Sequence, residues 1–88
     1  MKQIKESKKY NKDLDRIEKQ GKDLTKLFDV IKNIFFNITL AKKYKDHQLK
    51  GEMKDFRECH ISPDWLLLYI NTNESLYLVR TGSHSEIF

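Results

Sequence analysis

The sequence has 88 residues, of which 17 are Lys or Arg and 13 are Asp or Glu, so its formal net charge is +4. This length predicts a single domain over residues 1–88 with one modest core. The single cysteine excludes an internal disulfide and any zinc site built from several cysteines. The longest apolar run, Trp65 to Ile70, is too short to cross a bilayer, and the polar N-terminus lacks the apolar stretch of a signal peptide. We therefore expect a small basic protein of the cytoplasm that does not associate with membranes.

Charge is distributed unevenly along the chain. Residues 1–50 contain 14 Lys or Arg and 7 Asp or Glu, whereas residues 51–88 contain 3 and 6. A basic half of this kind attracts polyanions such as nucleic acids. Lys-rich helices also occur on soluble proteins that have no such partner, so charge alone leaves both interpretations open.

Two amphipathic helices are predicted in the first half, after a short extended segment at residues 2–5. Ser7 can cap a helix that ends near Gly21, and its apolar residues recur at helical spacing: Tyr10, Leu14 and Ile17. Asp23 can cap a second helix with a continuous apolar stripe: Leu24, Leu27, Phe28, Ile31, Ile34, Phe35 and Ile38. The short connection between them predicts a helical hairpin whose apolar stripe belongs to the core.

Strands are predicted in the second half, after a polar, Lys-rich loop at residues 39–53. The segment from Lys54 to Ile61 alternates, with Arg57, Cys59 and Ile61 on one face of the strand. A turn at residues 62–64 leads into a buried strand from Trp65 to Ile70, and a turn at residues 71–74 leads into a third strand at residues 76–80. On this third strand, Leu76, Leu78 and Arg80 are predicted to share one face. The fold class is therefore α+β, with the helical hairpin packed on a small twisted antiparallel sheet.

Five polar residues could carry out chemistry: His47, His60, Asp64, Arg80 and His84. One turn joins His60 to Asp64, and antiparallel pairing should bring Arg80 to the same end of the sheet. Imidazoles can take up and release a proton near neutral pH, and a guanidinium matches the geometry of a phosphate. These groups suit cleavage of RNA, in which a ribose 2′-hydroxyl attacks the neighbouring phosphate. The reaction requires no metal and no other cofactor.

Each candidate also has a structural interpretation. A single histidine in a small domain is more often a surface or half-buried polar residue than a catalytic one. Cys59 and His60 point to opposite faces of a strand, which argues against a zinc site and makes Cys59 a small packed residue. Trp65 opens an apolar strand and is typical of a core residue, although Trp65, Tyr44 and Phe88 could also stack on bases. Glu58 is interpreted as half of a cross-strand charge pair with Arg57. From these patterns alone, a ribonuclease is one interpretation among several.

Three segments together resemble a known family: Tyr44 to Gly51, Phe56 to Trp65, and Val79 to Phe88. In order and spacing they are similar to the YafQ branch of the RelE/ParE toxin superfamily. The resemblance implies a RelE-like fold and a bacterial type II toxin, which is an endoribonuclease that cleaves mRNA in the ribosomal A site. It further implies three kinds of partner: a cognate antitoxin protein, the ribosome with its mRNA, and operator DNA bound by the toxin–antitoxin complex.

The resemblance also implies roles for individual residues. His84 would be the leading acid–base residue, and His47 or His60, supported by Asp64, would make the complementary proton transfer. Arg80 would hold the scissile phosphate. The remaining expected substrate contacts are Trp65, Phe88, Tyr44 and Lys45.

Two other function classes remain open. Some members of the superfamily act by binding DNA gyrase and cut no RNA. A toxin fold that has lost its activity could serve instead as an RNA- or DNA-binding partner of its antitoxin, and the uneven charge would suit that function equally well. The presence of three histidines with Asp64 and Arg80 favours the nuclease.

Overall fold

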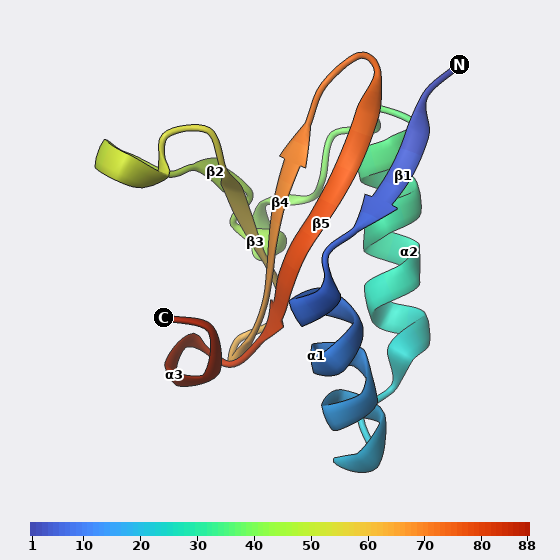
Figure 1. Ribbon diagram of the computed structural model, residues 1–88, viewed down its shortest axis with the longest axis vertical. Coiled ribbons are helices and arrows are strands. Elements are labelled where there is room, and N and C mark those ends of the chain that lie inside the picture. Colours follow the sequence, from blue (N-terminus) through green and yellow to red (C-terminus); the bar gives the residue numbers. More distant parts are fainter.

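In the computed structural model, which describes all 88 residues, two helices pack on a five-stranded sheet (Figure 1). The strand order across the sheet is β1-β5-β4-β3-β2. The strands are β1 (Gln3–Glu6), β2 (His47–Gln48), β3 (Arg57–Ser62), β4 (Trp65–Asn71) and β5 (Ser75–Gly82). The helices are α1 (Lys8–Lys19), α2 (Leu24–Phe35) and α3 (His84–Ile87), with 3₁₀ turns η1 (Lys42–Tyr44) and η2 (Gly51–Met53). No helix is long and apolar enough to cross a membrane.

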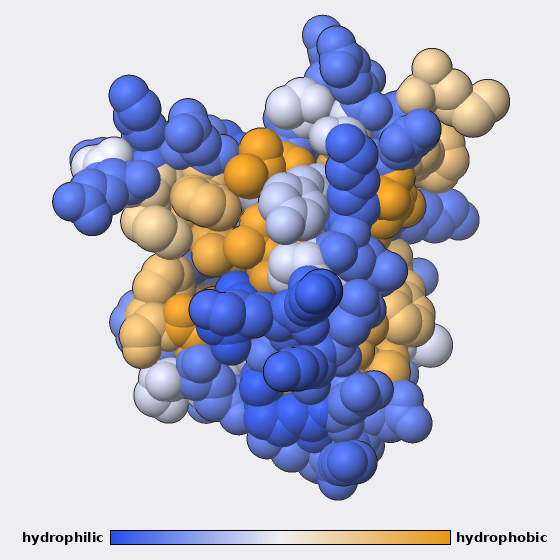
Figure 2. Space-filling model, viewed as in Figure 1, coloured by the Kyte–Doolittle hydropathy of each residue, from blue (hydrophilic) through white to orange (hydrophobic).

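Both predicted helix starts are confirmed by their caps. The Ser7 hydroxyl accepts a hydrogen bond from the backbone N–H of Tyr10 at 2.9 Å, and the Asp23 carboxylate accepts one from Thr25 at 3.0 Å. Between the helices, Gly21 has a φ of +77°, a conformation that glycine adopts at little cost. Hydrophilic side chains gather over α1 in the lower half of Figure 2.

The predicted apolar stripe of α2 is correct except at two positions. Phe28 is 48% exposed because it lies outside the arc of the helix that faces the sheet, and Val30 is buried in its place. Ile38 is exposed because the helix already ends at Phe35. The core between helices and sheet is one cluster that includes Tyr10, Ile17, Leu27, Val30, Ile31, Ile34, Cys59, Ile61, Trp65, Leu67, Tyr69, Leu76 and Leu78.

The sheet is mixed rather than antiparallel, which corrects the expectation from the sequence. β3, β4 and β5 form the predicted antiparallel meander, but β1 pairs in parallel with β5, from Gln3 opposite Ser75 to Glu6 opposite Leu78. Parallel neighbours must be joined by a crossover, and here the whole intervening chain supplies it. The predicted loop at residues 39–53 also contains a two-residue strand, β2, which pairs with the start of β3.

A β-bulge in β5 decides where Arg80 points. Leu78 lies opposite Tyr69 and Arg80 lies opposite Leu68, so Val79 is an extra residue on β5. Leu78 and Tyr69 belong to the core beneath the helices, and the extra residue moves Arg80 to the other face. The prediction that Arg80 shares a face with Leu78 is therefore wrong, because strict alternation does not survive a bulge.

Candidate active site on the open face of the sheet

Two rows of paired residues cross the face of the sheet opposite the core. In the first row, His47 on β2 pairs with Glu58 on β3, Glu58 with Leu68 on β4, and Leu68 with Arg80 on β5. In the second row, His60 pairs with Leu66, and Leu66 pairs with Gly82. Residues directly opposite one another in antiparallel strands share a face. The register therefore gathers His47, Glu58, His60 and Arg80 on one surface.

His47 is held by contacts on both of its ring nitrogens. Its Nδ1 lies 2.7 Å from the carbonyl oxygen of Lys45, which can only accept, so Nδ1 must carry a proton. Its Nε2 lies 3.7 Å from a carboxylate oxygen of Glu58. This geometry places Nε2 on the open face, beside the carboxylate of Glu58.

The loop that carries His47 is anchored by its neighbour, Asp46. The carboxylate of Asp46 accepts hydrogen bonds from the Tyr69 hydroxyl and from the Arg57 guanidinium, the latter at 3.1 Å. Desolvation works against the charge of Arg57, but the hydrogen bonds to Asp46 and Tyr69 outweigh it and raise the pKa of Arg57. Asp46 therefore holds the loop in place and does not face the ring of His47.

Glu58 is the site residue that the sequence reasoning missed. It is only 8% exposed although it carries a carboxylate. The expected charge pair with Arg57 is wrong, because adjacent strand residues point to opposite faces and Arg57 turns to Asp46 instead. The available signal in the sequence was the position of Glu58, two residues before His60 and therefore on the same face of the predicted strand.

His60 and Asp64 are joined by a turn but do not contact each other. Nδ1 of His60 lies 3.3 Å from the carbonyl oxygen of Pro63, which again requires the proton on Nδ1 and leaves Nε2 free. Asp64 is exposed at the turn and takes part in none of the ion pairs or side-chain hydrogen bonds of the chain. Among the carboxylates, Glu58 rather than Asp64 lies beside a histidine.

His84 and Phe88 are placed by the short helix α3, which packs against β5. Ser83 and Glu86 form a reciprocal capping box, in which the Ser83 hydroxyl accepts from the Glu86 N–H and the Glu86 carboxylate accepts from the Ser83 N–H. This Ser-x-x-Glu spacing is a helix signal in the sequence. The rings of His84 and Phe88 lie against each other with centroids 4.9 Å apart and an angle of 36° between their planes, and Phe88 is 53% exposed.

A buried carboxylate on α1 fixes Arg80. Asp13 is 1% exposed, accepts from Nε of Arg80 at 2.7 Å and from Arg16 at 2.8 Å, and also accepts from the backbone N–H of Thr81 at 3.1 Å. Burial raises the pKa of Asp13, but these hydrogen bonds outweigh it and the pKa lies below the usual value of 3.8. The hydrogen bond to Asp13 raises the pKa of Arg80, so the guanidinium stays charged. Arg16 also pairs with Glu86 at 2.9 Å, which ties α3 to the same network.

Of the three remaining sequence-based candidates, Trp65 and Tyr44 lie away from the open face and Lys45 lies beside it. Trp65 is 3% exposed in the core beneath the helices, and its indole N–H donates to the Thr81 hydroxyl at 2.8 Å, so it cannot stack on a base at the open face. Tyr44 is partly buried against the core, and Lys45 lies beside the site as the backbone partner of His47.

Burial raises the pKa of the Cys59 thiol to about 12, consistent with a packed rather than a reactive residue. No three side chains among His, Cys, Asp and Glu gather closely enough to hold a metal ion.

The chain matches a known family over nearly its whole length. The model of a family described as the bacterial toxin of type II toxin–antitoxin system, YafQ, matches residues 2–88. The mRNA interferase toxin YafQ of Escherichia coli K12 is 38% identical over 86 residues, which cover 97% of this chain and 94% of that protein.

Solved structures agree with this match. A metal-bound toxin from Helicobacter pylori is 52% identical with a TM-score of 0.92, and each chain is covered completely. The E. coli DinJ–YafQ complex contains a chain that is 35% identical with a TM-score of 0.92, covering 100% of this chain and 99% of that one. The fold is thus RelE-like, and the chain belongs to the YafQ family of bacterial toxins of type II toxin–antitoxin systems.

Proposed function

We propose that this protein is an mRNA interferase that cleaves mRNA in the ribosomal A site by metal-independent acid–base catalysis. The observation that carries the proposal is the gathering of His47, Glu58, His60 and Arg80 on one face of the sheet. Relatives that are 38% and 36% identical are mRNA interferase toxins of E. coli. Because its substrate is mRNA bound to the ribosome, the protein acts in the cytoplasm.

The reaction needs two proton transfers and one cation. A general base removes the proton of the ribose 2′-hydroxyl, and the oxygen then attacks the adjacent phosphorus. The bond from phosphorus to the 5′ oxygen breaks, and a general acid protonates that leaving oxygen. The products are a 2′,3′-cyclic phosphate and a 5′-hydroxyl, with no net gain or loss of protons.

We assign these roles to residues on the open face and at the C-terminal helix α3. His84 is the leading acid–base residue, and His47 or His60 makes the complementary transfer through Nε2, since Nδ1 of each lies against a backbone carbonyl. Arg80 stabilises the charge that develops on the phosphate. Glu58 supports the imidazolium of His47, a role expected of Asp64 from the sequence, because Glu58 is the carboxylate at 3.7 Å. Phe88, exposed beside His84, stacks on a base.

The partners follow from the same family. The E. coli relative has been crystallised in complex with DinJ, and we expect an antitoxin to cover and neutralise this toxin in the same way. We further expect the toxin–antitoxin complex to bind operator DNA. The small size of the protein suits a nuclease whose substrate is held by the ribosome.

The test compares three proteins in growing bacteria: the wild type, His84→Ala, and Ser85→Ala as a control on the same helix. We expect growth arrest and new mRNA 5′ ends, mapped across the transcriptome, with the wild type and the control but not with His84→Ala. Purified protein should cut mRNA only when ribosomes are present. Arrest without new RNA ends would favour the non-catalytic alternatives, in which the toxin binds gyrase or nucleic acid.

A further inference from the structure

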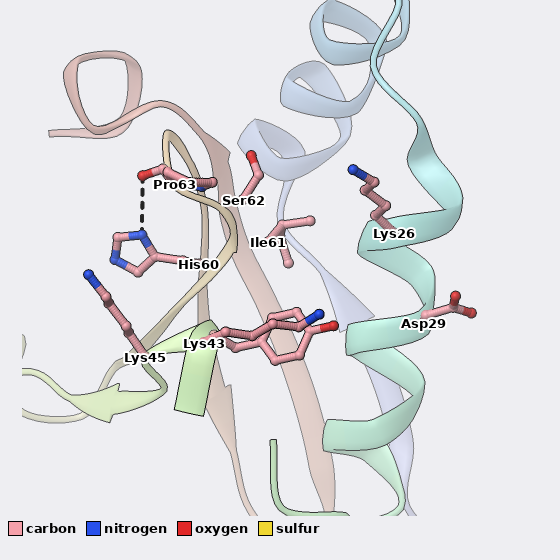
Figure 3. A pocket seen from close by; sticks show the side chains of 9 residues that line it. Lys26, Asp29, Lys43, Lys45, His60, Ile61, Ser62 and Pro63 are labelled. Atoms are coloured by element: carbon pink, nitrogen blue, oxygen red, sulfur yellow. Dashed lines mark hydrogen bonds between the residues drawn. The ribbon is translucent and has the colours of Figure 1, made fainter. Parts of the chain in front are cut away.

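A polar cavity opens beside His60 at the outer edge of the sheet (Figure 3). Its volume is about 530 Å³, which is in the range of small-ligand sites. Seven of the nine lining residues are polar or charged, so the cavity offers hydrogen-bonding groups and positive charge to a ligand. Its lining includes Lys26, Lys43, Lys45, His60 and Ser62.

The cavity exists because β2 is short. β2 covers only the start of β3, at Arg57 and Glu58. From Cys59 to Ser62, β3 pairs with β4 on one side and has no strand on the other. Helix α2 and the turn η1 form the remaining walls of the cavity. The open edge of β3 can therefore offer backbone N–H donors as well as side chains.

Three lysines, one from α2 and two from the segment at η1, line this cavity. Lys26 comes from α2, Lys43 from η1, and Lys45 follows η1 in a left-handed conformation with a φ of 49°. In Figure 3, Lys26 extends toward Ser62 and Lys45 toward the ring of His60. Asp29 also lines the cavity, but its carboxylate points away from it in Figure 3.

None of these lysines has an acidic partner. All five ion pairs of the chain use an arginine or His47 as the cation, and no lysine lies within 4.0 Å of a carboxylate. Unpaired cations in a concave site concentrate positive potential and attract a multiply charged anion. The lysines of α1 also have no acidic partner, but none of them lines this cavity.

His60 connects the cavity to the active site. It lines the cavity, and it also stands in the second row of paired residues on the open face. A nucleic-acid strand whose phosphate reacts at this face would pass directly from His60 into the cavity. The ligand best matched to three lysines, a serine and edge N–H groups next to a cleavage site is a second phosphate of the same strand.

We propose that this cavity binds the backbone phosphate of an mRNA nucleotide that flanks the cleaved bond. The inference rests on the proposed function, because it assumes that the strand reacts at the open face. The cavity then supplies affinity and alignment for the strand, while the groups on the open face make the proton transfers.

The test uses a fluorescent ten-nucleotide RNA in which the 2′-hydroxyls are methylated, so that it binds without being cut. A series of such RNAs carries one neutral methylphosphonate each, at successive positions. Binding is measured by anisotropy for the wild type, for Lys26→Gln/Lys43→Gln/Lys45→Gln, and for the matched control Lys8→Gln/Lys12→Gln/Lys19→Gln on α1, where all three lysines are exposed.

We expect the cavity variant to lose about tenfold or more in affinity, and its log–log salt slope to fall by about 0.7 for each lost phosphate contact. One methylphosphonate position should weaken binding to the wild type and to the control but not to the cavity variant. Equal losses in both lysine variants, no position with this coupling, or no binding of RNA to the wild type would each overturn the inference. A cavity variant that binds RNA normally but loses affinity for an acidic antitoxin, or for ribosomal RNA alone, would overturn it too.

Cleavage of mRNA on ribosomes is measured separately with the same proteins. One result is that the wild type cleaves mRNA while no methylphosphonate position shows a binding loss that depends on the cavity lysines. That result would reject the phosphate-binding role of the cavity and leave the proposed function standing. Absence of wild-type cleavage would reject the proposed function whatever the binding data show.

Discussion

At the scale of single residues, the carboxylate of Glu58 is the least expected part of the candidate active face. It is 8% exposed and lies 3.7 Å from Nε2 of His47. Burying a carboxylate is unfavourable unless a partner offsets the cost, and an imidazolium is such a partner. Glu58 therefore contributes most when His47 carries a proton.

Replacement of this carboxylate should slow cleavage. We expect Glu58→Gln to reduce single-turnover cleavage of ribosome-bound mRNA by about a hundredfold, because the neutral amide no longer stabilises protonated His47. Glu74→Gln, in an exposed turn, should cleave like the wild type. If both variants cleaved at the wild-type rate, Glu58 would have no part in the reaction.

The only thiol of the chain belongs to the core rather than to the site. A pKa of about 12, against the usual 9.0, lowers the thiolate fraction of Cys59 at neutral pH by roughly a thousandfold. We expect a disulfide reagent to label the native protein far more slowly than the urea-unfolded protein, in absorbance measurements of the released thiol. Cys59→Ala should retain cleavage, since this side chain faces the helices. Rapid labelling of the native protein would contradict the packing described above.

At the scale of elements, Gly82 controls how closely β5 approaches α1 and α3. It has a φ of +149°, and a Cβ atom added there would lie 2.5 Å from Arg16 Nη2 and 3.0 Å from Glu86 Oε1. A methyl group would thus separate Arg16 from Glu86, the pair that ties α3 to α1. The position of His84 depends on this close approach.

We expect Gly82→Ala to lower the free energy of unfolding by about 1–3 kcal/mol and to reduce cleavage. Gly21→Ala is the matched control, because Gly21 also has a positive φ but a Cβ there meets nothing within 4 Å. The control should cost about 1–2 kcal/mol from backbone strain alone and leave cleavage unchanged. Urea unfolding measures the loss of stability in each variant, and the cleavage assay shows whether the variant still cuts mRNA. Equal cleavage by the two variants would mean that α3 tolerates the methyl group.

At the scale of the whole molecule, Asp13 joins α1 to β5 and, through Arg16, to α3. Its pKa is depressed in the folded state, so it stabilises the fold above its usual value of 3.8 and loses that contribution as the pH falls through the folded value. The pKa of Glu86 is depressed as well, chiefly by the N–H of Ser83, which acts in the same direction. The molecule should therefore lose stability in acid, below about pH 4.

Removal of the Asp13 carboxylate should make the free energy of unfolding less dependent on pH in the acid range. We expect Asp13→Asn to lower the free energy of unfolding at pH 7 by about 3–5 kcal/mol, because Arg80 and Arg16 lose a buried partner. Below pH 4 the difference from the wild type should shrink. Urea titrations between pH 3 and pH 7, followed by the fluorescence of buried Trp65, measure both effects. Asp15→Asn, exposed on the same helix, should follow the wild type throughout. A constant difference between Asp13→Asn and the wild type at all pH values would show that the charge of Asp13 does not stabilise the fold.

The sequence by itself determined the features that depend on neighbours along the chain. The caps at Ser7 and Asp23 and the break at Gly21 are local signals, and the structure confirms each of them. The three strands of the second half are also present, although the alternation predicted for β5 fails at the bulge. Local alternation also placed Cys59 in the core and His60 on the opposite face. The fold class followed from these elements.

The tertiary structure alone decided which residues share the candidate active face. The register sets His47 opposite Glu58, and the bulge at Val79 turns Arg80 away from the core. The same packing buries Trp65 and brings Asp13 from α1 to Arg80. These features depend on the pairing of distant strands and on the balance between burial and charge. A bulge of one residue reverses the face of every side chain that follows it, and no local pattern in the chain reports that change.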